Sequence, residues 1–123
     1  MKFLVIGRGI DYGGPVDPAS FAMFSENVIM PSIEMLKDWE EKKVIAGGLL
    51  AGQRAGVMII EAASGEELSA WMHRLPFWAQ NTWEVMPLQS FQSGAEEVKQ
   101  QIANAKKMAE MVSSKQKYEP API

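Results

Sequence analysis

Three short stretches of this chain are apolar at nearly every position, and they limit its fold more than any other feature. They read FLVI from residue 3, VIAGGLLAG from residue 44 and VMII from residue 57. Their length and β-branched residues predict strands. A strand with one face in water alternates apolar and polar residues, because successive side chains point to opposite faces of the sheet. These strands therefore predict a sheet that is covered on both faces.

The first of these strands is followed by a predicted helix. Asp17 and Pro18 form a typical helix start, with Asp17 as the cap and Pro18 at the first helical position. Apolar spacing then continues to about Lys43. Pro31 predicts a kink near Asn27, because a proline cannot donate the backbone hydrogen bond to the residue four positions earlier.

A second helix and a last strand follow the middle two strands, which we expect to form a hairpin through Gln53 and Arg54. Ser64 and the glutamate three residues later form a capping box, and the helix that begins there ends before Pro76. Residues 81–91 predict the last strand, where Pro87 favours an edge position because it lacks a backbone donor.

The resulting order, β-α-β-β-α-β, predicts an α+β fold of the ferredoxin-like type. In this fold four antiparallel strands form one sheet and both helices cover the same face. We expect a single domain over residues 1–113, which includes a C-terminal helix over 94–112, followed by a disordered tail over 114–123. Nothing else in the chain is large enough to cover the second sheet face. A homodimer that packs two such faces into one barrel is therefore expected.

The composition excludes several classes of function. The chain has 123 residues, no cysteine and a net charge of −3, with its basic residues scattered. It therefore lacks a thiolate nucleophile and the basic stripe that nucleic-acid binding needs. No spacing of His, Asp and Glu suggests a metal site, and Tyr12 stands where a dinucleotide loop requires glycine. The opening is too short for a signal peptide and no stretch would span a membrane, so we expect a cytoplasmic protein without metal or nucleotide.

The stretch GQRAGVMIIEAASGEELSAWMHRLPFWAQNTWEVMPLQSF resembles the C-terminal half of the muconolactone isomerase family. The shared features are Gly-Gln before a turn and strand, an acidic helix start, Leu-Pro, and a Glu-Val-x-Pro-Leu edge strand. The resemblance covers roughly residues 44–91. It implies membership of the dimeric α/β-barrel superfamily, which also contains cofactor-free monooxygenases and cyclases.

The predicted topology brings several polar and aromatic residues to one end of the sheet. They are Asp11, Tyr12, Gln53, Arg54, His73, Phe77, Trp78 and Asn81. Rings in the loop LPFWAQN are expected to form the mouth of an apolar pocket. His73, Asp11 and Tyr12 are the candidate catalytic groups because they can transfer protons, although surface exposure or ordinary turn chemistry would also explain them. Arg54 and Asn81 are candidates for binding substrate oxygen atoms.

Ser25 and Ser32 interrupt the broad apolar face of the first helix. Small hydroxyl groups at these positions would leave room for a ligand and offer it hydrogen bonds. Alternatively, both serines bond to the preceding turn of their own helix. The sequence leaves these two interpretations open.

The sequence thus predicts an enzyme for a small apolar, aromatic or lactone-like substrate, of the isomerase or cyclase type that moves a proton. The alternatives are a non-catalytic binding or assembly module and a cofactor-free monooxygenase. The C-terminal helix carries a narrow apolar seam over Ala95, Val98, Ile102, Ala105, Ala109 and Val112. This seam predicts docking on another helix, with Met23 and Met30 of the same or the partner subunit as candidate contacts.

Overall fold

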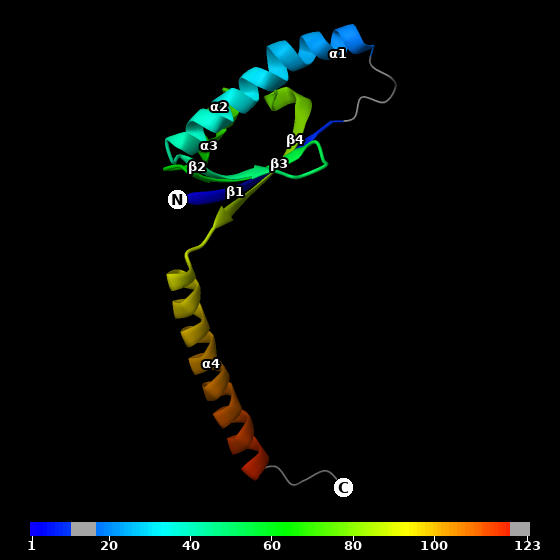
Figure 1. The fold of residues 1–123 in the computed structure, drawn as a ribbon. Helices are drawn as coiled ribbons and strands as arrows, with labels where there is room; N and C mark the ends of the chain where they lie inside the picture. Colours follow the sequence, from blue (N-terminus) through cyan, green and yellow to red (C-terminus); the bar gives the residue numbers. More distant parts are fainter. Residues whose placement is uncertain (11–16, 119–123) are drawn as a thin grey trace. The chain divides into compact units, whose positions relative to one another are not determined.

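The computed structural model describes residues 1–10 and 17–118 (Figure 1). The strands are β1 (Lys2–Gly9), β2 (Ile45–Leu49), β3 (Ala55–Glu61) and β4 (Asn81–Leu88). The helices are α1 (Pro18–Phe24), α2 (Met30–Glu41), α3 (Gly65–His73) and α4 (Phe91–Tyr118). A π-helical turn, Ser25–Ile29, joins α1 to α2, and a short 3₁₀ turn, Trp78–Gln80, precedes β4.

The four strands form one antiparallel sheet in the order β2-β3-β1-β4. Val5 of β1 lies between Met58 of β3 and Val85 of β4, and this register aligns the side chains of the central strands. Pro87 lies on the edge strand β4, where its missing donor costs no ladder bond to a further strand. The predicted ferredoxin-like α+β fold is confirmed.

The helices cover one face of this sheet. The core cluster joins Phe3, Val5, Met58 and Ile60 of the sheet to Leu68 and Met72 of α3, and Leu36 of α2 packs against it. Trp39 of α2 meets Trp71 of α3 edge to face, with ring centroids 5.1 Å apart. Because α2 and α3 both pack on this core, they form one helical layer over the same face of the sheet.

Local sequence signals set the helix boundaries. Asp17 caps α1 by accepting a hydrogen bond from the Ser20 backbone N–H at 3.0 Å. Two hydrogen bonds from Ser20 hold the pKa of Asp17 below its ordinary value, and the bond from the Ser20 hydroxyl has the larger effect, followed by the bond from its N–H. Ser64 accepts from the Glu67 N–H, and the Glu67 carboxylate accepts from the N–H of Ala63, the residue before the cap, so a close variant of the capping box forms.

The predicted interruption of the first helix is present as the π-helical turn Ser25–Ile29. Pro31 lies two residues after the end of this turn. Because proline has no N–H for the carbonyl of Asn27, the helical ladder cannot continue unbroken there. The side chain of Asn27 instead donates to the carbonyl of Met23 at 2.8 Å.

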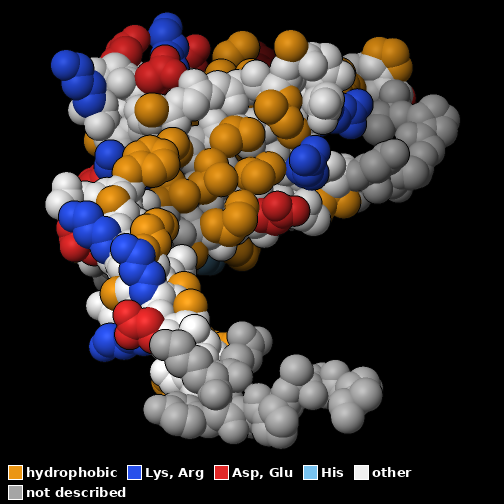
Figure 2. Space-filling view, turned by 90° about the horizontal axis from the view of Figure 1, so that it is seen from below, with side chains coloured by type: hydrophobic (Ala, Val, Ile, Leu, Met, Phe, Trp, Pro, Cys, Tyr) orange, Lys and Arg blue, Asp and Glu red, His pale blue; other side chains and the backbone are white. Residues whose placement is uncertain are grey.

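The other face of the sheet carries no helix of the domain and is rich in apolar side chains. The strand registers place Leu4, Ile6, Val57, Ile59 and Met86 on it, and we call this set the apolar sheet face. Figure 2 shows hydrophobic side chains gathered over this side of the sheet, with charged side chains around them. The surface matches the strand pattern that is apolar at both parities.

The chain divides into two compact units, Met1–Leu88 and Gln89–Ile123. In the second unit α4 is longer than expected, since it begins at Phe91 rather than at residue 94 and continues to Tyr118. Residues 114–118, which were predicted to belong to a disordered tail, are therefore helical. The rest of that predicted tail, 119–123, lies outside the described residues.

Candidate functional site

The face of the sheet below the helices changes character along its length. Near one end it carries the large side chains of the core, such as Phe3 and Val5. Toward the other end, Gly7 pairs with Gly56, and Gly47 lies one row away beside Met58. Because glycine has no side chain, the space above this part of the sheet is not filled from below. We call this part the glycine floor.

A cavity of about 1200 Å³ lies above the glycine floor and below α1 and α2. Its upper wall is apolar and includes Phe21, Phe24, Ile33 and Leu36. A mostly apolar cavity with a few polar groups is typical of small-molecule sites. The cavity is large enough for a ligand of several rings.

Two aromatic side chains form one wall of this cavity. The Trp83 indole lies over Gly7, so closely that an added Cβ at Gly7 would be 2.5 Å from the ring. Phe77 meets Trp83 edge to face, with ring centroids 6.0 Å apart. The Trp83 Nε1–H donates to the carbonyl of Trp78 at 2.9 Å, which fixes the indole orientation. The sequence-based site omitted Trp83, because its position opposite Gly7 follows from the strand register and not from a local pattern.

Polar groups of the cavity gather where β1 ends. The Gly9 N–H donates to the carbonyl of Arg54 at 2.7 Å, and the Ile10 N–H donates to the carbonyl of Gln80 at 3.0 Å. The Asn81 amide donates to the carbonyl of Phe77 at 3.0 Å. Three of the predicted site residues, Arg54, Phe77 and Asn81, thus line one cavity together, as do Gln53 and Gln80.

Two charged residues of α2, Lys37 and Glu40, also line the cavity, and the sequence-based site did not include them. Both are exposed, so they stand at its rim rather than inside the core. Within the described residues, neither these two side chains nor Arg54 takes part in an ion pair. The rim therefore offers two cationic groups and one carboxylate to a ligand.

Ser32 and Ser25 do not line the cavity. Ser32 is fully buried, and its hydroxyl donates to the carbonyl of Val28 at 2.8 Å and accepts from the Phe77 N–H at 3.0 Å. For Ser32 the structure thus supports the interpretation of a bond to its own helix, with the Phe77 loop as a second partner. Ser25 is half-buried within the π-helical turn.

His73 and Trp78 are brought together, but outside the cavity lining. Their rings stack with centroids 4.1 Å apart, and both side chains are exposed. The His73 Nδ1 lies 2.7 Å from the carbonyl of Ser69 and donates to it, because a carbonyl can only accept. The structure therefore separates His73 and Trp78 from the predicted site residues that line the cavity.

The remaining predicted catalytic residues, Asp11 and Tyr12, lie outside the described residues. They follow Ile10, which lines the cavity. In residues 1–10 and 17–118, no group of three or more His, Asp or Glu side chains is placed to hold a metal ion. No helix in the same ranges is long and apolar enough to cross a membrane.

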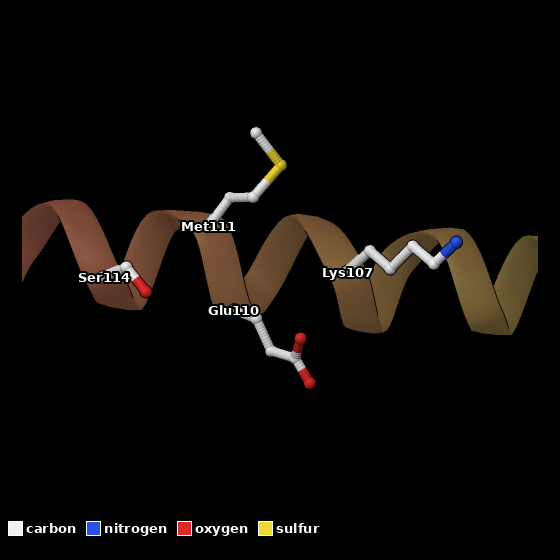
Figure 3. Close-up of a pocket in the computed structure, with 4 residues that line it drawn as sticks. All are labelled: Lys107, Glu110, Met111 and Ser114. Carbon is white, nitrogen blue, oxygen red and sulfur yellow. The ribbon is translucent and has the colours of Figure 1, made fainter.

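A second hollow lies along α4 and is lined by Lys107, Glu110, Met111 and Ser114 (Figure 3). All four side chains project from neighbouring turns of one helix. One helix surface cannot surround a ligand, so this hollow is not a candidate site.

Comparison with known proteins places the chain in a family. A family model described as YCII-related domain matches residues 22–92, more than half of the chain. The matched segment runs from α1 to the first residues of α4 and includes most of the cavity lining. No curated protein matches the chain. The specific resemblance to muconolactone isomerases is not confirmed, whereas the predicted superfamily is supported. The chain belongs to the YCII-related domain family, a member of the dimeric α/β-barrel superfamily.

Proposed function

We propose that this protein binds a small, mainly apolar molecule above the glycine floor and assists a proton transfer within it. The observation that carries the proposal is the cavity of about 1200 Å³, which is lined by aromatic and aliphatic side chains. A filled core would have favoured an assembly module. An open apolar cavity with polar groups at its rim favours a ligand site.

The lining indicates the class of the ligand. Trp83 and Phe77 offer flat surfaces on which an aromatic or lactone ring can pack. Asn81 and Arg54 lie near the end of β1, where they can hold carbonyl or carboxylate oxygen atoms. The proposed ligand is therefore a ring compound that carries at least one oxygen function.

The proton transfer needs an acid or a base beside the ligand. Asp11 and Tyr12 remain the first candidates, because they follow the lining residue Ile10 directly. Glu40 is a further candidate from α2, since a rim carboxylate can accept a proton from a bound carbon acid. His73 has no comparable support, because its side chain does not line the cavity.

We also propose that two copies associate through the apolar sheet face. Burying this face would remove Ile6, Ile59 and Met86 from water, and the hydrophobic effect favours such burial by about 25 cal/mol per Å². The superfamily is named for this kind of dimer. The proposal agrees with the strand pattern, which is apolar at both parities.

A thermal-shift screen tests the proposal: the melting temperature of the protein is measured in the presence of a library of aromatic acids, lactones and polyketide fragments. A compound that binds the folded state raises the melting temperature. We expect Trp83→Ala to weaken binding of such a compound by about tenfold or more, because a large part of its packing surface is lost. Trp78→Ala is the matched control, since this nearby tryptophan does not line the cavity.

Catalysis is tested separately from binding. The stabilising compound is incubated with the protein in deuterium oxide, and its NMR spectrum is followed. Deuterium incorporation that is lost in Asp11→Asn, Tyr12→Phe or Glu40→Gln supports proton transfer. Binding without any exchange or conversion would instead identify a binding module. Equal affinity of Trp83→Ala and Trp78→Ala for the compound would contradict the cavity as the binding site.

A further inference from the structure

The helix α4 is the part of the chain that the family match and the cavity leave unexplained. It spans Phe91–Tyr118, whereas the family match ends at residue 92. At 1.5 Å per residue its 28 residues extend over about 42 Å. Within residues 89–118, the described part of its own unit, nothing covers its apolar side chains, and Phe91 is 99% exposed. Such a helix is expected to have a partner.

The apolar residues of α4 follow a heptad pattern. Phe91, Ala95, Val98, Ile102, Ala105, Ala109 and Val112 alternate at steps of four and three residues. This spacing has a period of 3.5 residues, which is typical of helices that wrap around another helix. We call this set the α4 seam. Val98, Ile102 and Val112 on it are about half exposed.

The side of α4 away from the seam is more polar. By helical spacing, Lys107, Ser114 and also Met111 lie away from the α4 seam, and Figure 3 shows their side chains on one stretch of the helix. Glu96 forms a 3.4 Å ion pair with Lys99 on the surface. The side chains outside the seam are mostly polar or charged, with Met108 and Met111 as exposed exceptions, so α4 has the amphipathic pattern of a coiled-coil strand.

We propose that α4 pairs with the α4 of a second copy of this chain through the α4 seam. The argument is the length and period of the seam. Among the described helices, α1, α2 and α3 have 7, 12 and 9 residues, and a π-helical turn interrupts the line of α1 and α2. None of them offers a straight apolar stripe that matches three heptads. A second α4 does.

The residue sizes along the seam also suit self-pairing. In an antiparallel pair centred between Ile102 and Ala105, Ala95 faces Val112 of the other copy and Val98 faces Ala109. Every alanine then lies opposite a larger branched residue, so each layer is filled to a similar volume. The alanines let the helices approach closely but bury little area, and the pair is therefore weak unless the two copies are already held together.

The absence of cysteine in the whole chain gives a direct test. Full-length Ile102→Cys is mixed with full-length Ala105→Cys under mild oxidation, and each variant is also oxidised alone. We expect two chains to become linked by a disulfide. Linkage in the mixture would indicate an antiparallel pair of helices, and linkage of one variant with itself would indicate a parallel pair. Gln100→Cys, on the opposite side of the helix, is the control. Linkage no faster than in the control would overturn the proposal.

A charge placed in the seam supplies an independent measurement. Ile102→Asp is expected to weaken self-association of the full chain by about tenfold or more, since a buried apolar contact is replaced by a carboxylate. Gln100→Asp carries the same added charge on the opposite side and should leave the dissociation constant unchanged. Because Ile102 lies outside the compact unit Met1–Leu88, circular dichroism should show that unit folded in both variants. Equal dissociation constants for both would contradict the pairing.

Discussion

Ser32→Ala tests whether a buried hydroxyl group of the first helix serves structure or ligand. Ser32 is fully buried, and its Oγ accepts a hydrogen bond from the Phe77 N–H across 45 residues of sequence. The same Oγ donates to the carbonyl of Val28. Alanine removes both bonds and leaves the Phe77 N–H without this acceptor.

The expected loss follows from this geometry. A buried backbone donor that loses its acceptor costs about 1–3 kcal/mol, whereas the bond to the Val28 carbonyl adds little because a bond of this kind slightly destabilises a helix. The free energy of unfolding should therefore fall by about 1–3 kcal/mol. In a domain of the size of Met1–Leu88, each kcal/mol lowers the melting temperature by roughly 4–8 °C.

Urea denaturation followed by tryptophan fluorescence and circular dichroism measures this change. Ser25→Ala is the control, because Ser25 is only half-buried and should change stability by less than about 0.5 kcal/mol. For a compound found in the thermal screen, Ser32→Ala should retain most of the affinity, since Ser32 does not line the cavity. A stability loss below about 0.5 kcal/mol together with a large loss of affinity would refute this reasoning and return Ser32 to the ligand site.

Three further predictions concern the floor, the cap and the outer sheet face. Gly47→Ala should lower the free energy of unfolding by more than about 1 kcal/mol, because Gly47 has a φ of 146° and a Cβ there would collide with the Val57 carbonyl. Gly48→Ala is the control and should be near neutral, since the space at its Cβ is open. Equal losses of stability in the two variants would contradict the register. Asp17→Ala should lower the free energy of unfolding above pH 4, because a carboxyl group with a depressed folded-state pKa stabilises the fold only while it is ionised. The difference from the wild type should vanish as the pH falls below the lowered pKa of Asp17. A difference that persists in strong acid would count against the cap. Ile59→Lys should weaken dimerisation in sedimentation equilibrium, and an unchanged dissociation constant would remove the apolar sheet face from the interface.

The amino-acid sequence by itself determined the elements and their order, because the signals for these are local. A capping box at Ser64, a proline after the π-helical turn and short apolar runs each act within a few residues of chain. Once the order β-α-β-β-α-β is known, few topologies remain open. The strands are also apolar at both parities, and this pattern matches the apolar sheet face.

Only the tertiary structure decided which of these residues meet around the cavity. Two tryptophans stand five residues apart, yet Trp83 lines the cavity and Trp78 stacks on His73 outside its lining. Gly7 and Gly56 form a floor without side chains, on which the Trp83 indole lies, because the register pairs them across two strands. No local pattern contains that pairing. Ser32 likewise acquires its role from a loop 45 residues away. Side-chain contacts of this kind depend on how distant segments pack, so they appear only when the chain is folded.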